Sequence, residues 1–328
     1  MEIVIRFRIH YNQRERICCT VFGRVTRRHA LLPALIGGCF SMTNRSPRVA
    51  AIHDLSGFGR CSLAVVIPVL AAMGVQPCPV PTAVLSTHTG GFGNPVMHDL
   101  TDFVTPCMEH WQSLRLTFDC IYSGFLASER QADQVEAFID AWPDALAVVD
   151  PVMGDDGRPY RTYTPEMISK TAGLVKSADL ITPNMTEACI LLGDTFTSAA
   201  LGRDRARSML VRLSEKGPAT VVITGASVMP GKVSNIGYSR EDNAFWRVDY
   251  DFIPVSYPGT GDIFASVLVG GILTGDSLPL AMARASEFVG IAVRTAYGYN
   301  SEPRDGVMVE KSLPWLMSKN TITGYEPL

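Results

Sequence analysis

Short apolar runs alternate with helix-like segments from about residue 48 onward. Five of these runs have the composition of buried strands, and each ends in polar or glycine residues. They are residues 48–54, 118–125, 145–154, 178–184 and 219–227. Helical patterns lie among them, at residues 63–74, 128–142 and 186–193. Such alternation is typical of βαβ units, so it predicts an α/β fold of three layers, α/β/α, around a mainly parallel central sheet.

Residues 233–256 break this rhythm. Two runs of alternating apolar and polar residues flank the polar segment SREDN at residues 239–243. This pattern predicts an antiparallel hairpin at an edge of the sheet. Because no internal repeat or low-complexity linker interrupts residues 42–328, we expect them to form a single domain.

The first 41 residues differ from the rest in charge. They hold seven arginines and two acidic residues, a net charge of +5, whereas the remainder carries −8. Residues 24–40 superficially resemble an export signal, but the basic residues come late and the apolar run is short and broken. We expect residues 1–41 to be a disordered leader or the product of a start assigned upstream of Met42, and a chain beginning at Met42 to fold and act normally.

The whole chain of 328 residues has an ordinary globular composition, with 47% hydrophobic residues and a net charge of −3. No stretch reaches 18 consecutive apolar residues, so no transmembrane helix is predicted. The eight cysteines include no CxxC pair and no Cys/His cluster with zinc spacing. This usage predicts reduced thiols in a cytoplasmic protein rather than a disulfide framework.

Polar residues gather where the predicted strands end. Ligands of open α/β sheets bind beyond the carboxyl ends of the strands, so these side chains should converge on one rim. Each alone is an ordinary cap or turn residue, but a purely structural protein would not need the set. The set comprises Asp54, Asp150, Asp155, Thr182, Asn184, Glu187, Thr224 and Asp262.

The segment PGTGD, residues 258–262, stands directly before an apolar run at 263–273 that predicts a buried helix. Its glycines allow close approach of the backbone, and a helix N-terminus suits a phosphate group. Taken alone, Asp262 is better explained as a helix cap than as a functional residue. The local pattern therefore leaves a structural and a functional interpretation open.

Four motifs, in their order along the chain, carry a resemblance to a known family. They are STHTGGFG at 86–93, VVDPVMGDDGRPY at 148–160, ADLITPNMTEACILLG at 178–193 and PGTGDIFAS at 258–266. They resemble the ribokinase-like superfamily of ATP-dependent kinases and, within it, the pyridoxal and pyridoxamine kinase family. The resemblance is collinear from about residue 49 to 297. The chain has no GxxxxGK[ST] motif, which argues against a P-loop enzyme.

The resemblance implies a ribokinase-like fold and phosphorylation of the 5′-hydroxymethyl group of vitamin B6 in the salvage of pyridoxal 5′-phosphate. Asp262 would then be the general base that takes the substrate proton. The backbone amides of Gly259, Thr260 and Gly261 would form an anion hole for the transferring phosphoryl group.

The resemblance also implies an ATP side to the site, with Mg²⁺ as cofactor. The implied ATP-binding residues are Asp150, Asn184, Glu187 and Thr224. Asp155 and Glu187 would contact the metal, and Thr182 with Thr224 are candidates to place a monovalent cation (K⁺ or Na⁺) or a phosphate. For Asn184 and Glu187, a turn followed by an acidic first helical turn remains the alternative. Residues 155–166 are expected to form a flexible flap over ATP.

The substrate side is implied to include Asp54, His88, Thr89, Phe125 and Asp262. Phe125 stands where the family often has a tyrosine, and His88 is alternatively a packed histidine with satisfied nitrogens. Asp54 stands where pyridoxal kinases commonly carry serine. A carboxylate there predicts pyridoxamine as a better substrate than pyridoxal, unless Asp54 merely caps the turn at Ser56.

Other functions remain open at this stage. The leading alternative is a hydroxymethylpyrimidine kinase of thiamine synthesis, and a sugar kinase fits the 86–93 motif less well. A non-catalytic vitamin-binding protein would not need Asp262 as a base. The resemblance further implies a homodimer whose partners are small molecules and ATP, with no nucleic acid or membrane.

Overall fold

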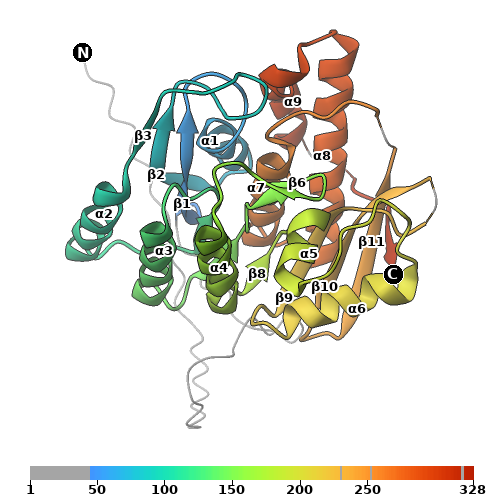
Figure 1. Ribbon diagram of the computed structural model, residues 1–328, viewed down its shortest axis with the longest axis horizontal. Helices are drawn as coiled ribbons and strands as arrows, with labels where there is room; N and C mark the ends of the chain where they lie inside the picture. The colour runs from blue at the N-terminus through green and yellow to red at the C-terminus, as the bar shows by residue number, and fades with distance from the viewer. Residues whose placement is uncertain (1–44, 230, 252, 319–320) are drawn as a thin grey trace, which may run out of the picture. The chain divides into compact units, whose positions relative to one another are not determined.

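The computed structural model describes residues 45–229, 231–251, 253–318 and 321–328, which form a central sheet between two layers of helices (Figure 1). In spatial order the strands of the sheet are β12 (Tyr325–Pro327), β11 (Ala244–Tyr250), β10 (Val233–Ser239), β9 (Thr220–Ala226), β8 (Leu180–Ile181), β5 (Leu146–Val149), β4 (Cys120–Ser123), β1 (Arg48–Ser56), β2 (Gln76–Leu85) and β3 (Met97–Asp99). The predicted fold class is confirmed.

The middle of the sheet is parallel and its edges are antiparallel. Strands β9, β8, β5, β4, β1 and β2 run in one direction. The predicted hairpin is present as β10 and β11, which pair from Val233 with Tyr250 to Ser239 with Ala244. Strands β12 and β3 add antiparallel pairs that the pattern did not predict.

Two groups of helices cover the two faces of the sheet (Figure 1). One face carries α2 (Thr101–Ser113), α3 (Glu129–Ala141), α4 (Pro165–Leu174), α5 (Met185–Leu192) and α6 (Arg203–Ser214), and the other α1 (Leu63–Ala72), α7 (Thr260–Leu273), α8 (Leu278–Gly298) and α9 (Val309–Leu316). Short 3₁₀ turns, η1 (Val175–Ser177) and η2 (Pro303–Asp305), connect some of them. Each face has its own hydrophobic core.

Helix α7 lies inside its layer rather than on the surface. Every residue from Ile263 to Gly271 is buried, as its apolar sequence predicted. It packs against α1 on one side and α8 on the other. Because α7 is enclosed in this way, the position of its N-terminus is fixed by the packing of the layer.

A small hairpin of β6 (Gly154–Asp155) and β7 (Arg158–Pro159) occupies the first part of the predicted flap. The positive φ angles of Asp156 and Gly157 close its turn. The flap prediction extended too far, because α4 begins at Pro165. The hydroxyl of Thr164 accepts a hydrogen bond from the amide of Met167 there, and proline suits the first helical position.

Three further predictions concern the chain as a whole. The interpretation of residues 1–41 lies outside the described residues. Within the part that the structure describes, no helix is long and apolar enough to cross a membrane. The five cysteines in that part are free thiols, as the spacing predicted.

Candidate active site

The carboxyl ends of the parallel strands bring several polar residues side by side. Backbone hydrogen bonds continue the ladder just past the strands, from the amide of Gly124 to the carbonyl of Ile52 (3.0 Å) and from the amide of Asp150 to that of Ser123 (2.9 Å). The amide of Thr182 binds the carbonyl of Val149 in the same way (3.3 Å). The ends of β1, β4, β5 and β8 therefore form one rim.

The N-terminus of α7 meets this rim. Gly259 is its N-cap residue, with a φ of 83°, and no side chain caps the helix. A Cβ on Gly259 would lie 2.0 Å from the carbonyl oxygen of Arg60, so only glycine fits both the angle and the space. No side chain occupies the amides of the first turn, which suits an anion, and the anion hole at residues 259–261 stays a prediction.

Asp262 is tied to the loop between β1 and α1. Its Oδ2 accepts a hydrogen bond from the backbone amide of Ser62 at 2.6 Å. Ser62 has a φ of 54°, an unusual angle for a residue with a side chain. Backbone strain of this kind is typical of functional sites, and here it occurs at the residue whose amide binds Asp262.

The other oxygen of Asp262 meets a residue that the sequence patterns did not single out. Nε2 of His53 lies 3.2 Å from Oδ1 of Asp262, and Nδ1 of His53 lies 2.9 Å from Oδ1 of Asp54. The hydroxyl of Ser56 donates to Oδ2 of Asp54 at 3.1 Å. His53 and Asp54 are almost fully buried. A continuous chain therefore runs from Asp54 through the imidazole to Asp262.

Within this row of hydrogen bonds, each charged group stabilises the charge of its neighbour. Burial lowers the pKa of His53, but the charge and hydrogen bond of Asp262, with those of Asp54, outweigh it and raise the pKa to about 10. Burial raises the pKa of Asp54, yet the hydrogen bond and charge of His53 bring it below its ordinary value. At neutral pH the ring is therefore an imidazolium between two carboxylates.

Gly124 provides the space for this ring. A Cβ on Gly124 would lie 2.1 Å from Cδ2 and 2.2 Å from Nε2 of His53. Such distances are far below normal contact, so the absence of a side chain is required. Gly124 follows β4 directly and precedes the candidate residue Phe125.

A second group of carboxylates lies on the part of the rim where ATP is predicted to bind. Burial, with the charge of Asp262, raises the pKa of Asp150 to about 7, although the charge of His53 opposes the shift. Burial and the charge of Asp150 raise the pKa of Glu187 well above its ordinary value. The charge of Asp262 thus acts on Asp150, and the charge of Asp150 acts on Glu187.

Asn184 and Glu187 form a capping box at the start of α5. The side chain of Asn184 accepts from the amide of Glu187, and the carboxylate of Glu187 accepts from the amide of Asn184 at 2.8 Å. The same side chains hold the flap, because Glu187 also accepts from the amide of Met153 and Asn184 donates to the carbonyl of Gly154. The turn and acidic first helical turn that were the alternative for this pair are therefore present. The same two side chains also fix the backbone at the start of the flap.

The donor set fits Mg²⁺ bound with ATP. Asp150 and Glu187 are buried carboxylates, and the charge of Asp150 helps to raise the pKa of Glu187, so a divalent cation near them would relieve this repulsion. Asp155 lies on the exposed hairpin of the flap. Since both oxygens of Glu187 already accept backbone amides, its contact with the metal remains a prediction.

Thr224 and Thr182 lie on neighbouring strand ends. Thr224 forms an isolated parallel bridge with Asn184, and its amide donates to the carbonyl of Pro183 at 3.0 Å. Thr182 is buried beside Asp150. These positions are compatible with the predicted phosphate or cation contacts.

On the substrate side, His88 is a packed histidine. Its Nδ1 accepts from the amide of Gly90 at 3.0 Å and its Nε2 donates to the carbonyl of Arg304 at 2.7 Å. Both ring nitrogens therefore bind backbone, which favours the structural alternative. The neighbouring Thr89 is exposed, on a loop that approaches the side chain of Pro258 near Gly90.

Phe125 is half-buried at the end of β4. Its ring lies edge-on to that of Tyr163, with centroids 5.9 Å apart. The hydroxyl of Thr82 donates to its carbonyl at 2.9 Å. These contacts place an aromatic side chain at the strand ends, and its contact with the substrate ring stays a prediction.

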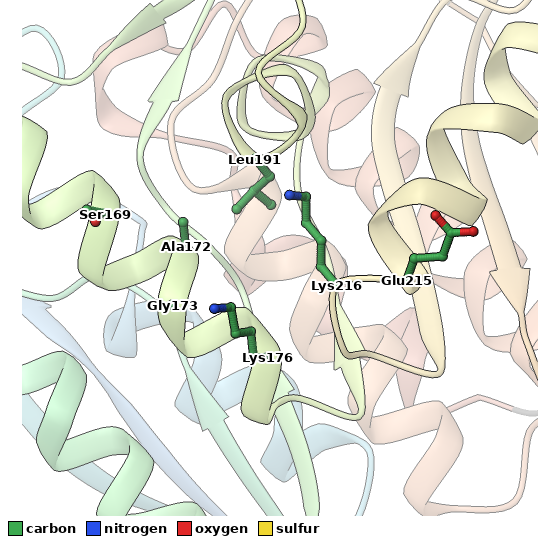
Figure 2. Close-up of a pocket in the computed structure, with 7 residues that line it drawn as sticks. All are labelled: Ser169, Ala172, Gly173, Lys176, Leu191, Glu215 and Lys216. Carbon is green, nitrogen blue, oxygen red and sulfur yellow. The ribbon is translucent and has the colours of Figure 1, made fainter.

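A hollow elsewhere on the molecule is unrelated to this site. Figure 2 shows it between α4, α5 and the end of α6, with a volume of about 410 Å³. Lys176 and Lys216 on its wall stand just before β8 and β9. It therefore lies at the amino ends of the strands, whereas the candidate site lies at their carboxyl ends.

A carboxylate beside an uncapped helix N-terminus, at the carboxyl edge of a parallel sheet, is the arrangement that the ribokinase-like resemblance implies. The sequence model of the phosphomethylpyrimidine kinase family matches residues 67–306. The chain belongs to this family of ribokinase-like kinases, together with the pyridoxal kinases that it resembles.

Individual relatives agree with this family. A crystal structure from Bacteroides thetaiotaomicron, described as a phosphomethylpyrimidine kinase in a form with pyridoxal, is 42% identical, with a TM-score of 0.82 over 87% of this chain and 100% of that chain. Pyridoxal kinase from Lactobacillus plantarum is 30% identical, with a TM-score of 0.76 over 83% and 96%. The pyridoxine/pyridoxal/pyridoxamine kinase of Bordetella avium is 28% identical over 74% of this chain and 82% of its own length.

Proposed function

We propose that this protein is an ATP-dependent kinase that phosphorylates the 5′-hydroxymethyl group of a B6 vitamer. The observation that carries the reaction type is the place of Asp262, in the first turn of α7 beside amides that no side chain caps. An anion site and a base within one helical turn suit phosphoryl transfer to a hydroxyl group. Simple binding of a vitamin would need no such base.

In the proposed reaction, the hydroxymethyl oxygen attacks the γ-phosphorus of ATP while its proton passes to Asp262. A new P–O bond forms, the bond between the γ-phosphorus and the bridging oxygen breaks, and ADP leaves with the electron pair of that bond. The amides of Thr260 and Gly261 would stabilise the charge on the phosphoryl oxygens. Mg²⁺ bound with ATP would neutralise phosphate charge, held on the side of Asp150, Asp155 and Glu187.

The flap would exclude water from this reaction. Its backbone is fixed to the start of α5 by Asn184 and Glu187, and the amide of Gly157 donates to the hydroxyl of Thr186 at 2.8 Å. The pKa of Tyr160 on the flap is raised by burial and by the charges of Glu187 and other carboxylates of the site. These contacts support a role of the hairpin as a cover over the phosphates.

The similarity to the pyridoxal-containing structure and to the named B6 kinases supports a pyridine substrate. Both carboxylate oxygens of Asp54 have partners inside the protein, which supports a structural role over the contact with the substrate that a preference for pyridoxamine would require. We therefore propose no order among the vitamers. Hydroxymethylpyrimidine is the second candidate substrate, favoured by the match to the phosphomethylpyrimidine kinase family.

A direct kinase assay separates the candidates. Purified full-length protein is incubated with Mg-ATP and, separately, pyridoxal, pyridoxine, pyridoxamine and hydroxymethylpyrimidine, and ADP formation is measured. We expect turnover of at least one B6 vitamer that depends on both ATP and Mg²⁺. Turnover of hydroxymethylpyrimidine without any turnover of the three vitamers would contradict the assignment.

A further inference from the structure

We propose that His53 is a positioning residue for the catalytic carboxylate, holding Asp262 through Nε2 while Asp54 holds the imidazole through Nδ1. The inference rests on the proposed function, because it concerns the carboxylate that would take the substrate proton. It assigns Asp54 to the ring of His53 rather than to the substrate.

The geometry fixes Asp262 at both oxygens. Oδ1 faces Nε2 of His53 at 3.2 Å and Oδ2 accepts the amide of Ser62 at 2.6 Å. These partners come from two segments, the end of β1 and the residue before α1. Contact at two points sets the plane of the carboxylate, so its remaining lone pairs face a fixed direction.

The end of β1 is shaped for this contact. Successive residues of a regular strand point to opposite faces, yet the side chains of His53 and Asp54 are hydrogen-bonded to each other. The pairing of β1 with β2 shifts register between His53 and Leu55, and such an irregularity redirects side chains. The register shift in β1 and the absence of a side chain at Gly124 therefore both help to accommodate the ring of His53.

The charge on the ring follows from what surrounds it. The titratable groups that face it or its two partners are Asp54 on β1, Asp262 on α7, Tyr122 on β4 with its ring 6.5 Å away, Asp150 after β5, and the Cys61 thiol. The pKa of about 10 keeps the ring protonated at neutral pH, so Nε2 donates to Asp262, while Nδ1 lies between the carboxylate of Asp54 and the backbone amide of the same residue, 3.0 Å away. As the pH rises through that value, the contact with Asp262 loses its positive charge.

A double-mutant cycle tests the positioning role. His53→Ala is compared with wild type, and again in the background of Asp262→Asn, with the substrate that turns over. We expect His53→Ala to lower kcat on the order of 10²-fold with little change in KM, and to lower it less than about threefold in the Asp262→Asn background. His53→Gln, whose amide can still donate to Asp262, should recover part of the loss.

Two outcomes separate this inference from the proposed function. If Asp262→Asn keeps the kcat of wild type, the proposed base is wrong. If Asp262→Asn lowers kcat as expected but His53→Ala lowers it equally in both backgrounds, only the positioning role of His53 is wrong. Thermal unfolding and ADP binding of each variant show whether it is folded.

The pH profile provides a measurement that a merely structural residue would not change. Asp54→Asn keeps an acceptor for Nδ1 but removes a charge that raises the pKa of His53. The alkaline limb of kcat should therefore move to lower pH, by about one to two units. Asp119→Asn is the matched control, because Asp119 binds the amide of Arg48 at the other end of β1. An unmoved limb in Asp54→Asn, or an equal shift in the control, would overturn the inference.

Discussion

Replacing Gly124 by alanine should damage the site through one identifiable contact. The new Cβ would lie 2.1 Å from Cδ2 of His53, whereas carbon atoms in contact prefer about 3.5–4.0 Å. The backbone cannot easily move away, because the amide of Gly124 binds the carbonyl of Ile52 within the ladder. The ring of His53 must therefore shift by roughly 1 Å or more to relieve the contact.

The magnitude of the effect follows from what the ring holds. A shift of that size lengthens the 3.2 Å contact between His53 and Asp262 beyond hydrogen-bond range. Crowding in a packed site typically costs about 1–3 kcal/mol of unfolding free energy. Misplacement of a catalytic group by 1 Å can cost on the order of 10²-fold in rate. We expect Gly124→Ala to show both losses, with a larger effect on kcat than on KM.

The assay combines urea unfolding with steady-state kinetics. Gly173→Ala is the matched control, because Gly173 lies in α4 and its new Cβ would meet nothing within 4 Å. Alanine there should leave activity unchanged and raise the unfolding free energy by up to about 1 kcal/mol. The combination of Gly124→Ala with His53→Ala should recover stability without recovering kcat.

Each result can refute part of this reasoning. Wild-type stability and kcat in Gly124→Ala would mean that the ring of His53 does not pack against Gly124. A double variant that recovers no stability would place the clash elsewhere. A double variant that recovers kcat would show that His53 does not serve Asp262.

Three further predictions test other parts of the site. Asp262→Asn should lower kcat by about 10²–10⁴-fold while ADP binding persists, and a variant with nearly full kcat would make Asp262 only a cap. Asn184→Ala removes the cap of α5 and the bond to Gly154, so urea unfolding should show a loss of about 1 kcal/mol, with a higher KM for ATP; an unchanged KM would argue against the role in the flap. Asp150 has its pKa raised from 3.8 to about 7, so its ionisation costs stability above pH 7 and the cost fades as the pH falls toward 3.8. Without Mg²⁺ or ATP, Asp150→Asn should thus have a higher unfolding free energy than wild type, and the gain should be larger at pH 8 than at pH 5. An equal gain at both pH values would contradict this.

The sequence was informative where function depends on residues next to each other. PGTGD places its turn and the proposed base within five positions, and the polar ends of β5, β8 and β9 can be predicted from the points where the apolar runs stop. His53 offers no such local pattern. Its partner Asp262 lies 209 positions away, and the space that it needs is provided by Gly124. Only the folded sheet brings these three residues together.

Strand β2 was missed for a different reason. It contains Pro77, Pro79 and Pro81, and prolines argue against a strand inside a sheet. The amide of Gln76 donates to the carbonyl of Pro47, on the side of β1, so the prolines at alternate positions have their nitrogens on the opposite side. There β3 pairs only with residues 83–85 of β2, and no donor is needed beside the prolines.

The interpretation of Asp54 changes once its contact with His53 is known. A carboxylate in place of the serine common in pyridoxal kinases first suggested a contact with the substrate. In the structure its partner is His53, and the hydrogen bond and charge of Asp54 add to those of Asp262 in keeping the buried imidazole protonated. His53 and Asp54 therefore act as one unit: serine at position 54 would remove one of the two carboxylate charges that raise the pKa of His53, and we expect this to weaken the contact between His53 and Asp262.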